Sequence, residues 1–600
     1  MIDKLAEEDC TGCGVCVDVC PVQAIFMHTD AEGFCYPKIN MDSCTQCNLC
    51  EKTCPVIHAE ELKKNDYADP VCYVGYSKNV EFRFESTSGG AFSALAIQMY
   101  REGGYVGGAV YGENYYIHHY ISNNKKDLPR LRSSKYAQSD AVGFYKEVKS
   151  ILDAGNKVLA CGTPCQMAGL RSFLRKKYKD LILVDFICLS ISSPKVQRLY
   201  LDYLEKKQQS SVVELKYKAK DIGWHNLSKR ICFANGKTVY GCRGIDHLSR
   251  AFHNHLSSRL SCYGCKFRGF PRISDITLAD FWGVDKLRPH LDNNCGTSAI
   301  LVNSQNGRAF WEKVAPRMIL EKISINDIIP GNHALLRSLP LPPKRAEFMA
   351  SLEKEPFDEL VDRMLPIVKR KTIKQWCMQS AKNVYNIFKV TSLYPKPLFQ
   401  FLKYNFFSPN IHTNWSKGAL IFPHRYCIIR IHKKAKINLD GYVILGEKRV
   451  PCSKLETRFL MDENSSLYVK TRFRMMYGSD VEVFKGAQLV VDWCGGNINN
   501  TIICGNRIEF GYQVALGRDV QIRDNNGNHH IALEGYKESH PVKIGTHVWL
   551  CSGAQIMPGA HIQDGAIVGA NSVVSGKIKA HTLVSGNPAK LVEENIYWNL

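Results

Sequence analysis

Four cysteines followed by a proline lie near the start of the chain, in the stretch Cys10-Thr11-Gly12-Cys13-Gly14-Val15-Cys16-Val17-Asp18-Val19-Cys20-Pro21. The same spacing, again closed by a proline, returns in Cys44, Cys47, Cys50, Cys54 and Pro55. The chain has 600 residues and 24 cysteines, and it starts with an acidic segment where an export signal would be basic and then apolar. We therefore expect a reducing cytoplasm, in which cysteines are metal ligands or buried thiols rather than disulfides.

This spacing resembles that of the bacterial two-cluster ferredoxins. In that pattern the first three cysteines of a run hold one [4Fe–4S] cluster and the fourth reaches across to the other. One cluster is thus expected on Cys10, Cys13, Cys16 and Cys54. The second is expected on Cys44, Cys47, Cys50 and Cys20. Two zinc sites are the alternative, but zinc has no use for an interleaved fourth ligand followed by proline.

Length and composition indicate a globular chain of several domains. Single cores stop growing near ~250–300 residues, so 600 residues favour about three or four domains. Hydrophobic residues make up 45% and charged residues 22%, and no apolar run is long enough for a membrane-spanning helix. The net charge is +21, yet residues 1–70 hold 13 acidic and 5 basic side chains. This asymmetry favours electrostatic docking, and no nucleic-acid-binding motif accompanies the positive charge, so we expect no nucleic-acid partner.

The central part of the chain alternates short apolar runs with helical patterns, which predicts an α/β fold. Strands are expected at Val71–Tyr76, Val158–Ala160 and Leu181–Ile187. Helices are expected at Phe92–Tyr100 and Gln166–Phe173. The loop Ser86–Gly90 precedes the first helix, where hydroxyls and bare amides suit a phosphate. An ordinary helix cap with a turn is the alternative.

Four segments of the first half resemble the beta-subunit family of coenzyme F(420)-reducing hydrogenases and dehydrogenases. They are Ser88-Gly89-Gly90, Ser134-Lys135-Tyr136-Ala137-Gln138-Ser139, Gly162-Thr163-Pro164-Cys165-Gln166 and Ser274-Asp275-Ile276-Thr277-Leu278-Ala279-Asp280-Phe281-Trp282-Gly283. The resemblance covers roughly residues 1–310 and implies an FAD-containing iron–sulfur oxidoreductase. It implies that the flavin lies near Ser88, Gly89, Gly90, Ser134, Lys135, Tyr136, Gly162, Thr163 and Gln166. A lysine near a flavin stabilises the anionic reduced ring.

Two segments depart from that family's pattern. Cys188-Leu189-Ser190-Ile191-Ser192-Ser193-Pro194 replaces its usual Cys-His-Gly followed by Pro-Ser-Pro, and Tyr217-Lys218-Ala219-Lys220 stands where an aromatic-Arg-Asp-Lys run is usual. Whether a deazaflavin is the substrate therefore stays open, and the electron donor and acceptor, a redox protein or a reduced cofactor, are not identified. The family often holds a cluster in this domain, so Cys165, Cys188, Cys262 and Cys265 are candidates for a third [4Fe–4S] site. Ordinary buried thiols are the alternative.

A basic stretch follows the central part. From Met364 to Leu439 the chain has 14 basic residues and no acidic residue. Val384, Ile387 and Phe388 lie among lysines at roughly helical spacing. Such a helix either lies on an anionic membrane surface or packs its apolar face on a neighbouring domain.

A period of six residues runs through the C-terminal part. Ile544, Leu550, Ile556, Ile562, Val568 and Val574 recur at that spacing, and before them so do Phe510, Leu516 and Ile522. Small residues, Ala554, Ala560, Ala566 and Ser572, follow the same rhythm. Apolar residues at every sixth position line a corner of a triangular prism, so we expect a parallel β-helix.

The repeats Ile544-Gly545, Val568-Gly569-Ala570-Asn571-Ser572-Val573-Val574 and Gly586-Asn587-Pro588-Ala589-Lys590 resemble the left-handed β-helix acyltransferases, over about residues 480–600. The resemblance implies an acetyl-CoA cosubstrate, a sugar or nucleotide-sugar acceptor and a homotrimer. It also places Trp549 at the CoA groove, although Cys551 replaces a glycine of the family's motif.

The hexad phase breaks between Ile522 and Ile544, which predicts a protruding loop containing Asp524, His529, His530 and His540. An acyltransferase of this kind needs a histidine to take the proton from the attacking acceptor hydroxyl. The family motif matches best at His529, and His530 is the alternative. An exposed loop without a catalytic role is the competing interpretation.

The sequence therefore predicts a ferredoxin domain at 1–62, a flavin and iron–sulfur domain at 70–345, a basic helical linker at 346–435 and a β-helix acyltransferase domain at 436–600. The leading hypothesis is a bifunctional cytoplasmic protein, an iron–sulfur flavin reductase fused to an O- or N-acetyltransferase of cell-surface polysaccharide biosynthesis. In one alternative the β-helix is only a trimerising scaffold. In another the chain is an electron-transfer adaptor at the inner face of a membrane.

Overall fold

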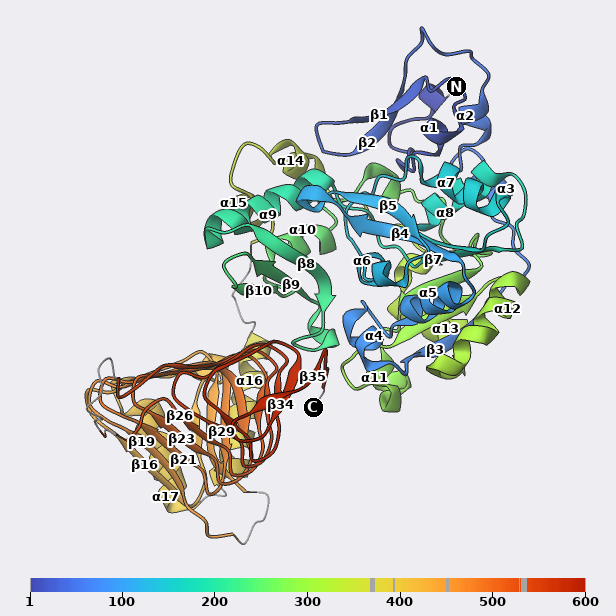
Figure 1. Cartoon of the computed structure of the whole chain (residues 1–600). Coiled ribbons are helices and arrows are strands. Elements are labelled where there is room, and N and C mark those ends of the chain that lie inside the picture. Colours follow the sequence, from blue (N-terminus) through green and yellow to red (C-terminus); the bar gives the residue numbers. More distant parts are fainter. Residues whose placement is uncertain are drawn as a thin grey trace. The chain divides into compact units, whose positions relative to one another are not determined.

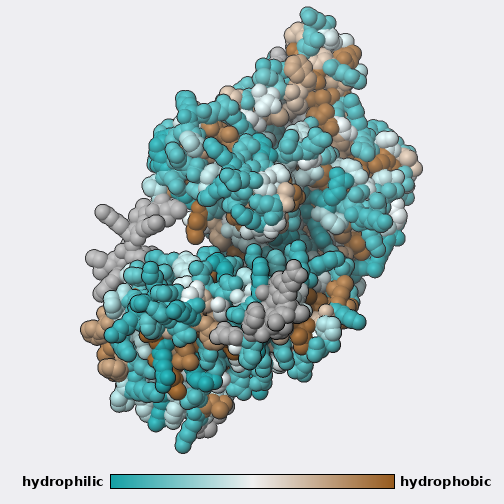
Figure 2. All heavy atoms as spheres, turned by 60° about the vertical axis from the view of Figure 1, so that its left-hand side comes forward, coloured by the Kyte–Doolittle hydropathy of each residue, from teal (hydrophilic) through white to brown (hydrophobic). Residues whose placement is uncertain are grey.

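The computed structural model of the chain describes residues 2–366, 373–391, 394–448, 453–527, 529 and 537–598. The chain divides into two compact units, Met1–Val368 and Lys369–Leu600. Among the described helices, none combines the length and apolarity needed to cross a bilayer. The face seen in Figure 2 is mostly hydrophilic, with apolar residues in small separate patches.

A small α+β region opens the first unit (Figure 1). Its strands β1 (Ile25–Thr29) and β2 (Cys35–Ile39) form an antiparallel hairpin, and its short helices are α1 (Val15–Val19), α2 (Leu49–Lys52) and α3 (Ala59–Leu62). Gly12 has a φ of +66°, and a Cβ there would lie 2.4 Å from Nε2 of Gln138. The glycine thus permits close contact with the central domain.

An eight-stranded sheet forms the centre of the first unit, in the order β13-β3-β12-β11-β7-β6-β4-β5. The strands are β3 (Val71–Ser77), β4 (Tyr105–Tyr111), β5 (Ile117–Ser122), β6 (Val158–Cys161), β7 (Leu181–Phe186), β11 (Ile276–Asp280), β12 (Ser298–Val302) and β13 (Met318–Ile323). β4, β6, β7 and β11 are parallel to their neighbours within this group, and the outer pairs are antiparallel. The predicted α/β class is confirmed.

Helices cover both faces of this sheet. Leu159 of β6 packs with α5 (Ala91–Arg101) and α12 (Gln305–Val314), while its neighbours Val158 and Ala160 pack with α7 (Phe144–Asp153) and α8 (Pro164–Leu174). Successive side chains of a strand point to opposite faces, so a strand buried on both faces must be apolar throughout. The three predicted strands and two predicted helices are all present, with ends that differ by one or two residues.

A second, three-stranded sheet, β10-β9-β8, lies in the same unit. It comprises β8 (Val212–Ala219), β9 (Ser228–Phe233) and β10 (Thr238–Gly241). Its core also receives α9 (Pro194–Gln208), α10 (His247–His253), α14 (Arg345–Ala350) and α15 (Phe357–Met364). Residues 345–364 thus pack within the first unit.

The second unit begins with α16 (Ile373–Thr391) and α17 (Pro395–Phe406), and continues as short strands from β14 (Ile411–His412) to β35 (Lys590–Glu594). The strands pair in parallel from coil to coil, except the last, β35, which is antiparallel to β34 (Thr582–Ser585). Ile544 pairs with Ile562, Leu550 with Val568, and Ile556 with Val574. Each partner is 18 residues along the chain, which is three hexads per coil. All six side chains are 2% exposed or less, as expected for the corner columns of a β-helix.

Candidate functional site

The first predicted set of cysteines lines one cavity of the first unit. Cys10, Cys13, Cys16 and Cys54 surround it, with Thr11, Gly12, Gly14 and Val15 between them and Ile2, Leu5, Pro37 and Val56 on the outer wall. All four cysteines are buried. Burial raises the pKa of Cys13 and Cys16, and the neighbouring cysteines add to the effect. Four thiols around an apolar cavity are the donor set that a [4Fe–4S] cluster requires.

The described residues contain no group of three His, Cys, Asp or Glu side chains arranged to hold a single metal ion.

The second predicted set lies closer to solvent. Cys50 is buried and interacts electrostatically with Cys16, whereas Cys20 and Cys44 are partly exposed and Cys47 is exposed. The backbone N–H of Leu49 is the main group that lowers the pKa of Cys47, and the N–H of Ala24 donates to Sγ of Cys20 at 3.2 Å. Amide donors of this kind stabilise thiolate ligands.

The four candidates for a third cluster come together from distant parts of the chain. Cys165 lies in the first turn of α8, Cys188 follows β7, and Cys262 and Cys265 lie in the loop after Arg259. All four line a second cavity, together with Thr11, Pro164, Leu189, Ser190, Ile191, Ser261, Phe267, Arg268, Arg272 and Ala334. Burial raises the pKa of Cys165 to about 12 and that of Cys262 to about 11. Cys161 and Cys295 are not among the residues that line this cavity.

Donors and a positive charge surround the third set. The backbone N–H of Ile191 donates to Sγ of Cys262 at 3.4 Å, and Oγ1 of Thr163 lies 3.1 Å from Sγ of Cys165. Arg268 donates to the carbonyl oxygens of Cys188 and Leu189 at 3.2 and 2.8 Å, and its buried Nε has no partner among the described residues. These groups suit a site that carries negative charge.

The residues expected near a flavin form two adjoining loops. Thr87 Oγ1 accepts from the backbone N–H of Ser134 at 2.9 Å, which joins the loop Ser86–Gly90 to the segment that contains Lys135. Gly90, with a φ of +86°, precedes the first turn of α5. Ser88 Oγ donates to the carbonyl of Thr297 at 2.8 Å, and the Gly89 N–H donates to Ser298 Oγ at 2.9 Å, so both groups are bonded to the β12 end of the sheet.

Lys135 is held by backbone carbonyls instead of by a carboxylate. Its Nζ donates to the carbonyls of Arg130, Leu131 and Arg132 at 2.7, 3.3 and 3.0 Å, at the end of α6 (Leu128–Leu131). Burial lowers the pKa of Lys135 to about 7. A lysine in this state takes up a proton readily when negative charge develops beside it.

The remaining predicted residues are Tyr136, next to Lys135 in the chain, and Gly162, Thr163 and Gln166, at the start of α8. Tyr136 packs on Tyr217 with ring centroids 5.0 Å apart. A Cβ on Gly162 would lie 3.2 Å from Oε1 of Gln166. Thr163 and Gln166 form the capping box of α8, and Gln166 also donates to Ser139 Oγ at 2.9 Å.

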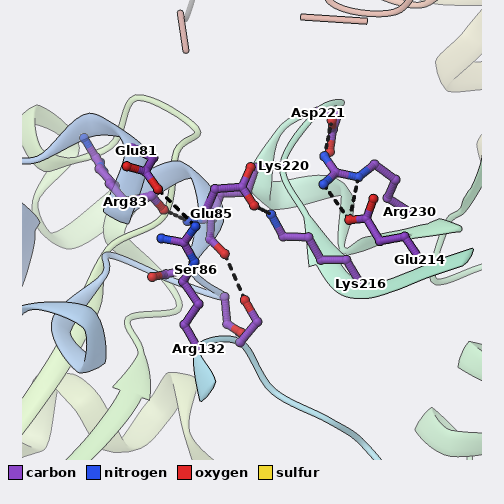
Figure 3. Close-up of polar contacts among 12 residues, drawn as sticks. Glu81, Arg83, Glu85, Ser86, Arg132, Glu214, Lys216, Lys220, Asp221 and Arg230 are labelled. Atoms are coloured by element: carbon purple, nitrogen blue, oxygen red, sulfur yellow. Dashed lines mark hydrogen bonds and ion pairs between the residues drawn. The ribbon is translucent and has the colours of Figure 1, made fainter. Parts of the chain in front are cut away.

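Figure 3 shows a buried ionic network beside the Ser86–Gly90 loop. Lys216 pairs with Glu85, Arg132 lies 3.1 Å from Glu81, and Arg230 lies 2.7 Å from Glu214 and 2.9 Å from Asp221. Lys216 lies in β8, directly before the segment Tyr217–Lys220 in which the chain departs from the family pattern. Because Lys216 is buried, pairing with Glu85 is needed to offset its desolvation.

Lys220 holds the loop without a carboxylate partner among the described residues. Its Nζ donates to the carbonyls of Arg83 and Ser88, and burial lowers its pKa well below the ordinary value. Near it, the buried Nη2 of Arg83 has no partner among the described residues. Cationic donors in surplus over carboxylates suit an anionic group such as a cofactor phosphate. Sequence reasoning missed this role of Lys220, whose only signal is the run of lysines at alternate positions from Lys216.

In the second unit the structure describes the two ends of the predicted loop. Asn525 and Ser539 form an antiparallel bridge at its base, and Asp524 accepts from the N–H groups of Gly505 and Asn506 at 2.6 and 2.8 Å. His529 is exposed, and its Nδ1 lies 3.1 Å from the carbonyl oxygen of Asn526. His530 lies outside the described residues. His540 is exposed, and its N–H donates to the carbonyl of Asp524 at 2.8 Å.

The Asn526 contact assigns the proton of His529 to Nδ1, because only a donor pairs with a carbonyl. Trp549 is 40% exposed, and the centroid of its ring lies 5.8 Å from that of Trp598. The two tryptophans thus form an aromatic patch on the β-helix.

Three family models match the chain. They are a 4Fe-4S dicluster domain at residues 9–57, the C terminus of the coenzyme F420 hydrogenase/dehydrogenase beta subunit at 155–328, and the bacterial transferase hexapeptide, six repeats, at 541–576. The chain thus resembles iron–sulfur oxidoreductases in its first part and hexapeptide-repeat acetyltransferases in its last part, and the family resemblances expected from the sequence are confirmed.

The curated relatives match the hexapeptide part. A Saccharomyces cerevisiae protein named as an acetyltransferase is 27% identical over 172 residues, 28% of this chain and 83% of that protein. A Staphylococcus aureus protein of the same description is 37% identical over 67 residues, 11% of this chain and 34% of its own length. The lipopolysaccharide biosynthesis O-acetyl transferase WbbJ of Escherichia coli is 46% identical over 57 residues, 10% of this chain and 29% of that protein. The match thus spans only about a third of the length of the Staphylococcus protein.

Among solved structures, the F420-reducing [NiFe] hydrogenase complex of Methanosarcina barkeri is similar at 19% identity. That match covers 50% of this chain and 93% of the other, with a TM-score of 0.32. The polySia-specific acetyltransferase NeuO is similar at 19% identity over 29% of this chain and 84% of the other, with a TM-score of 0.18.

Proposed function

We propose that the chain is a bifunctional enzyme, an iron–sulfur flavoprotein oxidoreductase joined to an acetyl-CoA-dependent O- or N-acetyltransferase of cell-surface polysaccharide biosynthesis in the cytoplasm. The observation that carries the redox half is the convergence of two cysteine sets on two cavities of the first unit. Three [4Fe–4S] clusters are assigned, on the two ferredoxin sets and on Cys165, Cys188, Cys262 and Cys265. A two-electron cofactor is needed where single electrons are collected, and we assign FAD.

FAD is placed at the loops around Lys135 and Lys220. Support comes from the surplus of buried cationic donors beside the N-terminus of α5, which suits the pyrophosphate, and from Lys135, which suits the reduced ring. When bound, FAD supplies two-electron chemistry with an external partner. The chain's own groups bind and orient it: Lys220 holds the Ser88 carbonyl, and Lys135 holds a proton at Nζ.

In the transferase half, His529 is assigned as the general base toward the acceptor hydroxyl or amine, and Trp549 as a CoA contact. We propose a left-handed coil, a homotrimer and a sugar or nucleotide-sugar acceptor for this half. We propose the domain layout expected from the sequence, with a ferredoxin domain at 1–62, a flavin domain at 70–345, a basic helical segment at 346–435, whose first residues up to 364 pack within the first unit, and the transferase at 436–600.

Two assays test the two halves separately. Anaerobic reductive titration should bleach flavin and cluster absorbance together, and clustered protein that takes up no FAD would contradict the flavin assignment. Turnover of acetyl-CoA with nucleotide sugars tests the transferase, and complete inactivity with all acceptors would favour a β-helix that only assembles the chain.

Contact with a membrane surface is a second candidate function, favoured by one observation. α17 exposes Phe399 and Phe406 and contains Lys396 and Lys403, in a stretch without acidic residues. Aromatic and basic side chains together suit an anionic bilayer surface. Sedimentation with anionic and neutral liposomes tests this: binding to neither would rule it out.

A further inference from the structure

Thr11 lies on a wall that two cavities share. One cavity is lined by Cys10, Cys13, Cys16 and Cys54, and the other by Cys165, Cys188, Cys262 and Cys265. Thr11 lines both, and in the described chain no other residue belongs to both linings. A single residue thus separates the first ferredoxin site from the third-cluster site.

The hydroxyl of Thr11 is buried and has no hydrogen-bond partner among the described residues. Burying a hydroxyl without a partner costs free energy, so such groups normally pair with something in the working protein. The groups that face the two cavities nearby are cysteine sulfurs. A sulfur atom, from a thiolate or from a bound cluster, is therefore the natural acceptor.

The two sites are held rigidly against each other around Thr11. A Cβ on Gly169 of α8 would lie only 3.7 Å from Sγ of Cys13, and α8 also carries Cys165. Cys13 and Cys165 interact electrostatically. Arg259 donates to the Cys10 carbonyl at 2.8 Å, and its own carbonyl accepts from the N–H of Cys262 at 3.0 Å. Arg259 thus bonds to a residue of each of the two cavities on either side of Thr11.

We propose that Thr11 is a positioning residue between two electron carriers, and that its hydroxyl donates a hydrogen bond to a sulfur of one of them. The inference rests on the proposed third cluster. In each transfer one cluster gives up one electron and its neighbour gains it, and no atom moves. A hydrogen bond to sulfur stabilises the extra negative charge of the reduced state, so it raises the reduction potential of that cluster.

The test compares Thr11→Val, which keeps the shape and removes the hydroxyl, with Thr11→Ser, which keeps the hydroxyl. Full-length protein is purified without oxygen, its iron is counted, and each cluster is titrated by EPR. Thr11→Val should keep all its iron, and at a fixed potential the reduced-to-oxidised ratio of one cluster should fall about three- to tenfold. A tenfold change corresponds to about 59 mV for one electron. Thr11→Ser should match the wild type.

The adjacency of the first ferredoxin cluster and the third cluster is tested by a separate EPR measurement. Reduced wild type should show more spin–spin broadening of the first cluster's EPR signal than the second ferredoxin cluster alone produces. Cys265→Ala should remove this additional broadening while both ferredoxin clusters remain.

Unchanged potentials in fully loaded Thr11→Val, or the same broadening in fully loaded wild type and in Cys265→Ala, would overturn the inference. Equal loss of iron in the Val and Ser variants would also overturn it, because the variant that keeps the hydroxyl would then be as defective as the variant that lacks it. A wild type with only the ferredoxin iron would refute the third cluster itself, and the iron count identifies that failure before any potential is measured.

Discussion

Nε of Arg259 donates a hydrogen bond to the carbonyl oxygen of Cys10 at 2.8 Å, joining the central domain to the loop that supplies the first cluster ligand. The same guanidinium donates to the carbonyl of Cys35 at 3.1 Å and to Oε1 of Gln138 at 3.1 Å, and it lies 4.0 Å from the centre of the Tyr36 ring. Arg259 is fully buried. The ferredoxin region is therefore attached to the central domain by specific polar contacts.

Replacing Arg259 by Met should detach the ferredoxin region without removing its ligands. Each carbonyl left without a donor costs about 1–3 kcal/mol, so the free energy of unfolding of the first unit should fall by a few kcal/mol. Stopped-flow reduction under anaerobic conditions should show the flavin reduced more slowly than the ferredoxin clusters. Arg308→Met, at an exposed ion pair with Glu312, is the control and should change neither. Unaltered flavin reduction in Arg259→Met would show that the contact is dispensable.

Loss of one cysteine from the third set should remove one cluster. Cys188→Ala is expected to lower the iron content from about twelve to about eight atoms per chain, because each cluster holds four. Cys161→Ala is a matched control, since Cys161, like Cys188, is a partly exposed cysteine of the central domain but is not among the residues of the cavity lining. Iron analysis of both variants decides the matter. Equal iron in Cys188→Ala and wild type would remove Cys188 from the ligand set.

The charge of Lys135 should respond to pH near neutrality. Burial lowers its folded-state pKa to about 7, whereas an unfolded lysine titrates near ~10.4. Between these values the unfolded chain binds a proton that the folded chain lacks, so the contribution of Lys135 to stability rises with pH across this window. The difference in unfolding free energy between wild type and Lys135→Met should therefore grow from about pH 7 upward.

Lys177→Met, at a side chain that is 89% exposed, should show no such dependence. The FAD potential should also be more negative in Lys135→Met than in wild type, because the reduced ring loses a cation. A pH-independent stability difference together with an unchanged FAD potential would contradict the role of Lys135.

His529→Ala should lower acetyl transfer by about 10²–10⁴-fold, the usual contribution of a general base. His540→Ala on the same loop is the control and should retain most activity. The visible spectrum of the clusters should be the same in both variants, since the loop belongs to the other unit. Full activity in His529→Ala with loss in His530→Ala would move the assignment by one residue.

The features that were predictable from sequence are those that depend on the spacing of residues close together in the chain. The cysteine runs and the hexads from Ile544 to Val574 recur at fixed intervals, and each interval reflects one geometric unit, a ligand turn or a prism corner. The strand β6 was predictable because burial on both faces demands an apolar run. Such patterns need no knowledge of distant contacts.

The rest depends on contacts between distant residues. Arg259 lies 249 residues from Cys10, and Gln138 lies 126 residues from Gly12, so neither contact leaves a local pattern. Lys216 and Lys220 resemble solvated lysines in sequence, because the carboxylate and carbonyls that offset their burial come from residues 83–88. Likewise, only the tertiary structure places Thr11 between two cavities.

Iron and acid-labile sulfide, counted per chain in full-length protein purified without oxygen, test the central claim most directly. We expect about twelve of each, four for each of three clusters. A folded protein loaded with zinc and lacking sulfide would contradict the iron–sulfur account altogether.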